Sequence, residues 1–395
     1  MESKVQHRME KLAIRRFSVL IWCFVLVWGG GCGAGDAAHK APFVGQTRIA
    51  LNDPNLFFSP YNWFLDGTQS AITTQPGAYL TVGFQSPHIS LDIDTSALAS
   101  LPSSAMPVLR WQIDKGPLQS YQFAAGTMEI PLNLAPLADG KHLCKVWFVA
   151  ADYRQDRWIV PVEAVRITGL TLDAGGTTVA PTLQNKRILF FGDSITEGER
   201  TESALHGPTH DDDATHAFPY SCANALGAEF GVVGVSRQGW TIAGYDSSNV
   251  PTFPAAWSMQ FADKRREFAP EPDYVVVVQG VNDQNAEAKV AQVQAAIQSW
   301  LEAARTAMPT SRLCLVVPFS GFEREAITQA VHAYKAAHLS DSRVFLIDLG
   351  ASAQAGLSDP SGASSPRSHD GLHPDAATSQ ALGTQLAAAI QSVAP

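Results

Sequence analysis

Residues 188–198 read ILFFGDSITEG, and they are the strongest indication of the fold in this sequence. The first four of them are an apolar run of the kind found in buried parallel strands. The run leads directly into Gly192, Asp193 and Ser194, so we expect Ser194 at the carboxyl end of a strand, where a helical turn begins. There its hydroxyl can face a crevice and its N–H has no helical partner. Serine is also a common helix N-cap, so this segment alone leaves both roles open.

Apolar runs of this kind alternate with helix-like stretches through the C-terminal half of the chain. Short, nearly continuous apolar runs occur at 187–191, 231–235, 274–278, 313–317 and 344–347. Helix-like stretches occur at 218–226, 287–308, 323–338 and 376–393. Alternating strands and helices predict right-handed βαβ crossovers and a parallel sheet covered by helices on both faces. Ligands of such sheets gather at the carboxyl ends of the strands.

The preceding part of the chain has a different pattern. Short alternating or β-branched runs, broken by Pro, Gly, Asp and Ser, occur at 79–84, 89–94, 108–114, 145–150 and 158–172. This spacing is typical of an all-β sandwich or jelly roll. We therefore predict a β domain over 43–175, a linker over 176–186 and an α/β domain over 187–395. The cysteines at 144, 222 and 314 (Cys144, Cys222 and Cys314) are expected to be small buried apolar residues.

The first residues predict export. Residues 1–16 are rich in Lys and Arg, 17–28 are apolar, and glycines precede Cys32. A basic stretch, a short apolar run and a small-residue exit make an export signal, assigned here to 1–32 and followed by a tether over 33–42. The residues before Cys32 resemble a bacterial lipobox, so the alternatives are a lipoprotein of the cell envelope and a secreted or periplasmic protein. The apolar run is shorter than the about 20 residues of a spanning helix, which disfavours an uncleaved anchor.

Composition narrows the class of protein. The 395 residues carry a formal charge of −9 and 46% hydrophobic residues, which excludes wholesale disorder and argues against a nucleic-acid binder. Five cysteines in this length exclude a disulfide scaffold.

Three more segments contain candidate functional residues. Two of them follow predicted strands, and one lies in a loop near the end of the chain. Asp370 and His373 are three residues apart before the last helix-like stretch, a spacing at which the carboxylate can orient the imidazole. Asn282 follows the run at 274–278 and offers amide donors for a developing oxyanion. Gly239 follows the run at 231–235 and can present its N–H. Each is also compatible with an ordinary turn or surface loop.

Together these segments resemble the SGNH (GDSL-type) hydrolase family, whose blocks they match in order over residues 186–393. The resemblance implies a flavodoxin-like three-layer α/β/α fold and Ser–His–Asp esterase or lipase chemistry without a metal or cofactor. It implies the catalytic residues Ser194, His373 and Asp370, and an oxyanion hole of Ser194, Gly239 and Asn282. The chain departs from the family at Arg237, where members often carry Asn.

The order of the segments is also similar to bacterial carbohydrate esterase family 2, acetyl esterases that act on plant polysaccharide. That resemblance rests on looser motifs before Ser194: Ile113, Asp114 and Gly116; Leu137, Asp139, Gly140 and His142; Gly169, Leu172, Asp173 and Gly175. It implies an acetylated carbohydrate as the substrate. The alternatives are a lipid or lysophospholipid esterase with the same triad and a carbohydrate-binding surface protein without catalysis.

The positions of two further residues predict that they lie near the expected cleft. Trp240 directly follows Gly239, so it either stacks on a sugar or belongs to the core or a lid; it is taken as substrate-binding together with Asp193. The polar insertion 199–217 can rim the cleft. Its His and Asp residues show no ligand-like order, so we expect a solvated acidic loop rather than a metal site.

Overall fold

The structure is a computed structural model that describes residues 43–359 and 361–394. The export signal, the tether and Cys32 therefore lie outside the described residues. The described residues form one compact unit. None of the helices described combines the length and apolar character needed to cross a bilayer.

The N-terminal half consists of two antiparallel sheets, as the alternating pattern predicted. One has the order β3-β4-β11-β6-β9 with β1 paired to β11, and the other has the order β12-β5-β10-β7-β8 with β2 paired to β5. Leu80, Val82 and Phe84 from one sheet share a buried cluster with Leu91 and Leu170 from the other, so the sheets pack face to face. The strands are β1 (Thr47–Ile49), β2 (Leu56–Phe58), β3 (Phe64–Asp66), β4 (Ser70–Thr73), β5 (Tyr79–Gln85), β6 (Ile89–Ile93), β7 (Val108–Ile113), β8 (Gln119–Gln122), β9 (Glu129–Pro131), β10 (His142–Ala150), β11 (Val165–Leu172) and β12 (Thr177–Val179).

Two segments differ from the sequence prediction. Residues 158–164 are not part of a strand, because the backbone N–H groups of Trp158 and Ile159 donate to the Asp156 side chain and Pro161 has no donor. The segment assigned to the linker contains β12, which extends the second sheet along β5. A short polar run can complete a sheet edge without an apolar pattern of its own.

The C-terminal half contains a five-stranded parallel sheet of order β14-β13-β17-β18-β19. Counted in chain order within this sheet, the order is 2-1-3-4-5, which is the flavodoxin-like order. Phe191 of β13 lies between Val233 of β14 and Val277 of β17. The strands are β13 (Lys186–Gly192), β14 (Ala228–Gly234), β17 (Tyr274–Val278), β18 (Arg312–Val316) and β19 (Val344–Ile347).

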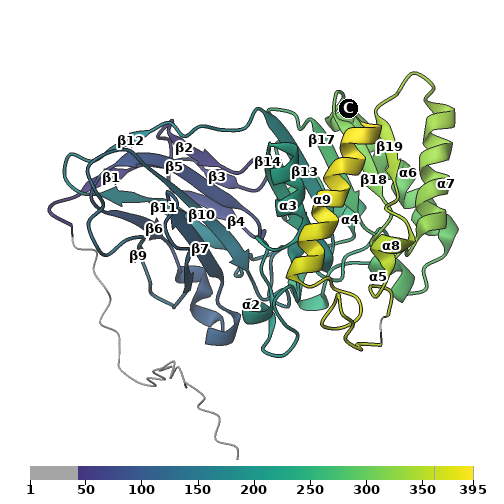
Figure 1. Cartoon of the computed structure of the whole chain (residues 1–395), viewed down its shortest axis with the longest axis horizontal. Coiled ribbons are helices and arrows are strands. Elements are labelled where there is room, and N and C mark those ends of the chain that lie inside the picture. The colour runs from purple at the N-terminus through teal and green to yellow at the C-terminus, as the bar shows by residue number, and fades with distance from the viewer. Residues whose placement is uncertain (1–42, 360, 395) are drawn as a thin grey trace, which may run out of the picture. The chain divides into compact units, whose positions relative to one another are not determined.

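Helices cover both faces of this sheet (Figure 1). Alternate side chains of β13 point to opposite faces: Phe190 packs with α3 (Phe218–Leu226) and α9 (Ala376–Val393), and Leu189 packs with α6 (Val290–Ala307) and α7 (Arg324–Ala337). These four helices confirm the four helix-like stretches, with small shifts at the ends. The predicted buried cysteines are also confirmed, since Cys144, Cys222 and Cys314 are buried and free.

The remaining elements are short. They are the α-helices α1 (Ser194–Glu197), α2 (Pro208–Asp211), α4 (Phe253–Ala256), α5 (Val281–Asn285) and α8 (Ala351–Gln354), the 3-10 helices η1 (Ser96–Ser100), η2 (Ser103–Ala105) and η3 (Asp246–Ser248), and the hairpin strands β15 (Met259–Phe261) and β16 (Lys264–Arg265).

The N-terminal half covers the outer edge of β14. The Asn62 side chain donates to the carbonyl of Val232 at 2.6 Å and accepts from its N–H at 3.1 Å, as a neighbouring strand would. The Tyr79 hydroxyl accepts from the Phe230 N–H at 3.1 Å. A strand edge otherwise exposes unpaired backbone groups. The antiparallel sheets therefore join the parallel one through hydrogen bonds as well as apolar packing.

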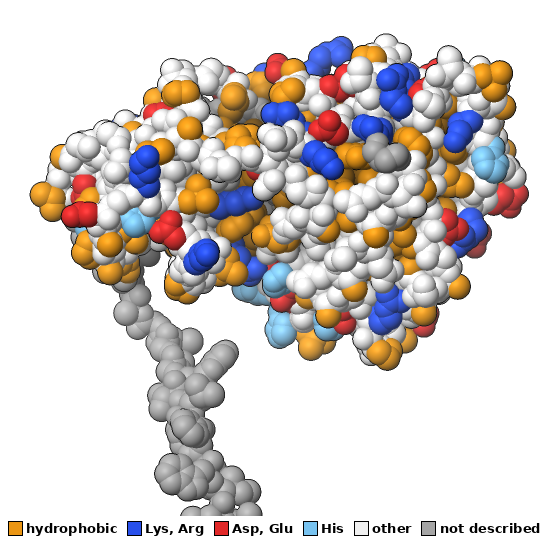
Figure 2. Space-filling view, turned by 45° about the horizontal axis from the view of Figure 1, so that its top comes forward, with side chains coloured by type: hydrophobic (Ala, Val, Ile, Leu, Met, Phe, Trp, Pro, Cys, Tyr) orange, Lys and Arg blue, Asp and Glu red, His pale blue; other side chains and the backbone are white. Residues whose placement is uncertain are grey.

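Charged side chains on the face shown in Figure 2 are interspersed. Acidic and basic groups alternate there with apolar and neutral polar ones. This arrangement fits the low charged fraction of the sequence, 16%.

Candidate active site

Three side chains from distant parts of the chain form a hydrogen-bonded series. Nε2 of His373 lies 2.8 Å from Oγ of Ser194, which is 179 residues earlier in the chain. Nδ1 of the same ring lies 2.7 Å from Oδ2 of Asp370. All three residues are buried, with exposed fractions of 6%, 8% and 6% for Ser194, His373 and Asp370. The structure thus brings the hydroxyl, the imidazole and the carboxylate together in the order that a nucleophile, a base and an orienting group require.

The end of β13 places Ser194. The Asp193 carboxylate caps α1 by accepting from the Ile195 N–H at 3.1 Å, so Ser194 is the first helical residue rather than the cap. A side chain at Gly192 would overlap Thr196 and the carbonyl of Val278, which explains the glycine before the cap. Within the part of the chain that the structure describes, no acceptor is recorded for the Ser194 N–H.

The loop before α9 places the other two groups. Oδ1 of Asp370 accepts from the backbone N–H groups of His373 at 2.8 Å and Leu372 at 3.0 Å, and from the Ser368 hydroxyl at 3.0 Å. Oδ2 is then left to face the imidazole. The carboxylate therefore shapes its own loop and orients the His373 ring at the same time.

Arg200 adds a positive charge to this series. Its guanidinium forms an ion pair with Oδ2 of Asp370. Burial raises the pKa of Asp370, but the hydrogen bonds and charges of His373 outweigh it and hold that pKa far below its usual range. Burial lowers the pKa of His373, while the hydrogen bond to Asp370 and the nearby Glu199 raise it, and the net direction is upward. Asp370 is therefore an anion throughout the range in which the imidazole changes charge.

Asn282 lies at the same edge of the sheet, in the first turn of α5. Its amide nitrogen donates one hydrogen to the carbonyl of Gln238 at 3.0 Å, which orients the group. An amide carries two hydrogens, so one remains for another acceptor.

Gly239 departs from the prediction. Its N–H donates to the carbonyl of Ile242 at 2.9 Å, because the loop after β14 closes on itself, so this N–H is already engaged. The glycine has another physical reason: a Cβ there would overlap the Asp283 carboxylate. Asp283 in turn accepts from the N–H groups of Trp240 and Thr241, each at 2.8 Å.

Both predicted substrate-binding residues are corrected by their burial. Trp240 is 2% exposed, packs against Phe253 and Trp300, and donates its indole N–H to the carbonyl of Gln279. Asp193 is 1% exposed and caps α1. Burial raises the pKa of Asp193 to about 7. Neither side chain can lie against a sugar.

The insertion 199–217 is not the solvated acidic loop that its composition predicted. Asp211, Asp212 and Asp213 are buried, with exposed fractions of 4%, 8% and 1%. Asp213 forms an ion pair with Arg110 of β7, so the insertion packs against the N-terminal sheets. Asp211 accepts from Ser203, His206 and Gly207 within the insertion, so local hydrogen bonds as well as the ion pair to Arg110 hold these carboxylates in buried positions.

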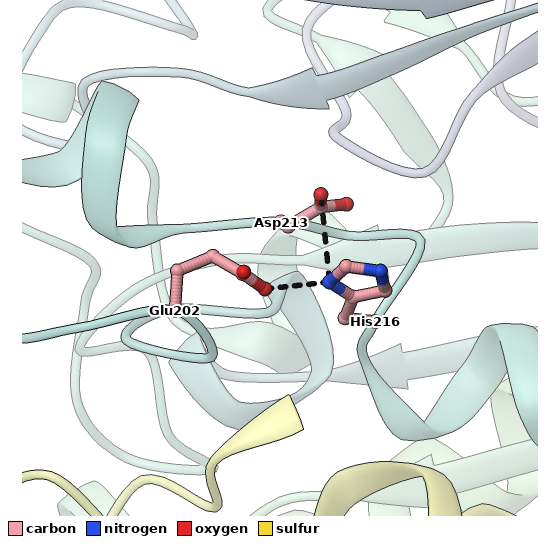
Figure 3. Close-up of side chains that lie close together, drawn as sticks. All are labelled: Glu202, Asp213 and His216. Atoms are coloured by element: carbon pink, nitrogen blue, oxygen red, sulfur yellow. Dashed lines mark hydrogen bonds and ion pairs between the residues drawn. The ribbon is translucent and has the colours of Figure 1, made fainter. Parts of the chain in front are cut away.

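One group within the insertion has ligand-like geometry. Glu202, Asp213 and His216 present atoms that all lie within 4.8 Å of one another, and Figure 3 shows both carboxylates facing the same ring nitrogen of His216. Nδ1 of His216 is 2.6 Å from Glu202 and 3.6 Å from Asp213. The Glu202 hydrogen bond raises the pKa of His216 despite its partial burial. With Arg110 on Asp213, the groups already balance one another as an ion-pair cluster.

Sequence reasoning missed what the N-terminal half contributes. Arg157, from the loop after β10, forms a buried ion pair with Glu197 of α1. Glu197 also accepts from the Ser236 N–H at 3.1 Å, which ties α1 to the loop after β14. Arg200 and Glu199 directly follow the nucleophile block in sequence, and their position was the only signal that could have found them.

The fold and the site define the class of protein. A hydroxyl, an imidazole and a carboxylate are joined at the carboxyl edge of a parallel sheet of order 2-1-3-4-5, the arrangement expected of a serine hydrolase of the SGNH type. Residues 190–381 match the family described as GDSL-like Lipase/Acylhydrolase. The match covers the hydrolase half of the chain, and the protein is a carboxylic ester hydrolase. No curated protein matches the sequence.

Solved structures similar to this chain share the fold across both halves. A family two carbohydrate esterase from Cellvibrio japonicus aligns with a TM-score of 0.71 at 18% identity, covering 88% of this chain and 98% of that one. An acetyl xylan esterase from Butyrivibrio proteoclasticus aligns with a TM-score of 0.70 at 14% identity, covering 89% and 98%. A family two carbohydrate esterase from Clostridium thermocellum, in complex with cellohexaose, aligns with a TM-score of 0.68 at 18% identity, covering 85% and 98%.

The close approach at Gly239 makes a stability prediction. In Gly239→Ala the new methyl group displaces the Asp283 carboxylate from the N–H groups of Trp240 and Thr241. Overpacking of this kind costs about 1–3 kcal/mol. Urea unfolding measures the change in the free energy of unfolding, and an unchanged midpoint would contradict the packing role.

Proposed function

We propose that this protein is an exported serine esterase that removes O-acetyl groups from carbohydrate through an acyl-enzyme. The observation that carries the proposal is the 2.8 Å contact between Nε2 of His373 and Oγ of Ser194. A base at hydrogen-bond distance is what a serine hydroxyl needs to become a nucleophile.

Acylation begins when Nε2 of His373 takes the Ser194 proton and Oγ attacks the ester carbonyl. The negative charge that develops on the carbonyl oxygen is stabilised by the Ser194 N–H and the second amide hydrogen of Asn282. The Gly239 N–H now donates to the carbonyl of Ile242. In this proposal Gly239 contributes to the oxyanion hole only by sharing that N–H with the carbonyl oxygen of the substrate. Nε2 then returns the proton to the oxygen of the leaving sugar hydroxyl, and the acetyl group stays on Ser194.

Deacylation uses the same groups in reverse. His373 takes a proton from water, the hydroxide attacks the acetyl carbonyl, and the proton returns to Oγ as acetate leaves. Asp370 holds the ring in one orientation throughout, with Nδ1–H donated to Oδ2, so that Nε2 alone gains and loses the proton.

The carbohydrate assignment is supported by the fold shared with the family two carbohydrate esterases and by the surroundings of the site. The rings of Tyr153 and Tyr245 are 5.3 Å apart at their centroids and half-buried. The Arg237 guanidinium lies 5.6 Å from the Tyr245 ring. Burial raises the pKa of Tyr153, and the charge of Glu199, which lies 3.9 Å from Nε2 of His373, adds to this rise. We propose that these half-buried rings contact the sugar, the role first assigned to Trp240.

Export, with or without a lipid on Cys32, remains part of the proposal and rests on the composition of residues 1–32. Its test is fractionation of cells expressing the full chain and a Cys32→Ser variant. A lipoprotein is found in the membrane fraction and leaves it in the variant, whereas a secreted protein is soluble in both forms.

Removal of the nucleophile or the base tests the mechanism. We expect Ser194→Ala and His373→Ala each to lower kcat on an aryl acetate by about 10³-fold or more, because the two groups act as a unit. Asp370→Ala loses less, since it removes only the orienting group. His369→Ala, an exposed histidine in the same loop, is the matched control and keeps full activity. Substantial activity in Ser194→Ala with an intact circular dichroism spectrum would refute the assignment.

Asn282 provides a second test. Loss of one oxyanion donor typically lowers kcat by about 10²–10³-fold, so we expect that loss in Asn282→Ala with little change in KM. Asn285, exposed on the same helix, is the matched control. Equal rates for the two alanine variants would remove Asn282 from the oxyanion hole.

The acyl group and the substrate class are tested by two measurements. We expect aryl acetate to be hydrolysed faster than butyrate and longer esters, and acetate to be released from at least one of acetylated xylan, mannan and pectin. A preference for long acyl chains would favour a lipid esterase instead. Glycan binding without turnover on any ester would favour a non-catalytic binding protein.

A further inference from the structure

A second carboxylate faces the candidate base. Oε2 of Glu199 lies 3.9 Å from Nε2 of His373, the nitrogen that also faces Ser194. Glu199 is 4% exposed, and its Oε1 is buried without a hydrogen-bond partner in the part of the chain that the structure describes. Other buried carboxylate oxygens among the described residues, such as Oδ2 of Asp212, also lack a hydrogen-bond partner. Glu199 is distinguished by its place beside the nitrogen that faces Ser194.

The backbone holds Glu199 at this position. Gly198 ends α1 in the left-handed conformation, with φ of 97°, and a Cβ there would lie 2.9 Å from the carbonyl oxygen of Asp213. The Glu199 N–H then donates to the Ser194 carbonyl at 3.0 Å. The nucleophile and Glu199 are therefore linked through one turn of backbone, and the distance from Glu199 to the ring is set by the same loop that sets Ser194.

Other charges surround the pair. Burial raises the pKa of Glu199 to about 7; the charge of His373 opposes this rise and that of Glu197 adds to it. Burial also raises the pKa of Asp212. The titratable and charged groups that face Glu199 or His373 from the surrounding elements are Asp370, Arg200, Glu197, Asp212, Arg157, Tyr153 and Asp193.

We propose that Glu199 is a positioning residue of the catalytic centre, one that stabilises the positive charge His373 acquires when it takes the proton of Ser194. The ring then lies between two carboxylates, with Asp370 at Nδ1 and Glu199 beside Nε2. No proton passes to Glu199: Nε2 receives it from Oγ and delivers it to the leaving alcohol. Glu199 acts through the ring and makes no bond to the substrate.

This role predicts the direction in which the pKa of His373 changes when the charge of Glu199 is removed. An ionised Glu199 favours the imidazolium, so it raises the pH below which His373 is protonated and cannot act as a base. An opposite charge within about 4–6 Å shifts a pKa by about 1–3 units in isolation, and Arg200 and the proton on Glu199 near neutral pH reduce that effect. Glu199→Gln keeps the shape of the side chain and removes the charge.

The experiment compares Glu199→Gln with the wild type by the pH dependence of kcat/KM on an aryl acetate. The acidic limb is expected to move to lower pH by about one unit. The plateau kcat is expected to fall by about tenfold, because one pKa unit corresponds to one tenfold change in an equilibrium. KM stays nearly constant, since Glu199 does not contact the substrate.

Two further variants separate charge from structure. Glu199→Asp keeps the charge and is expected to restore part of the limb's position. Glu202→Gln removes a carboxylate from the same insertion that pairs with His216 instead of His373, and its profile is expected to match the wild type. A limb that stays in place in Glu199→Gln, with or without a change in melting temperature, would overturn the proposal.

This inference rests on the proposed function, and NMR titration of the His373 ring keeps the two distinguishable. If the wild type hydrolyses no ester, the proposed function fails, while the His373 pKa is still compared between the wild type and Glu199→Gln. A lower ring pKa in the variant supports the electrostatic link, and an unchanged one excludes it.

Discussion

The Asp370 carboxylate accepts from the imidazole of His373, from two backbone N–H groups of its own loop and from the guanidinium of Arg200. Each oxygen has its own task, since Oδ1 shapes the loop and Oδ2 orients the ring. The rest of the site depends on this arrangement, because Nε2 faces Ser194 only when Nδ1 is held. A flexible ring would lose the alignment that makes the hydroxyl reactive.

Several buried charged side chains surround the hydrogen-bonded series of Ser194, His373 and Asp370. Glu197, Glu199 and Asp212 are all buried within one stretch of chain, and Arg157 and Arg200 supply the opposite charges. Burying charges is costly unless they are paired. Arg157 lies in the loop after β10. The N-terminal half therefore supplies one of the positive charges that neutralise buried carboxylates in the hydrolase half.

Prediction from the sequence succeeded where local chemistry decides. The runs 274–278 and 344–347 and the stretches 218–226 and 376–393 have the predicted bounds, because buried parallel strands and amphipathic helices carry strong periodic signals. It failed at Trp240, Asp193 and the insertion 199–217. Whether a side chain near a strand end points to solvent or to the core depends on neighbours far along the chain.

The sequence by itself determined the succession of strands and helices and the residue types at the strand ends, since these follow from hydrophobic periodicity and turn chemistry. Only the tertiary structure decided that Oγ of Ser194 and the ring of His373 meet at 2.8 Å, that Gly239 makes room for Asp283, and that Glu199 faces the imidazole. Those contacts join segments up to 179 residues apart, and hydrogen bonds and burial at such separation arise only when the sheets and helices have packed.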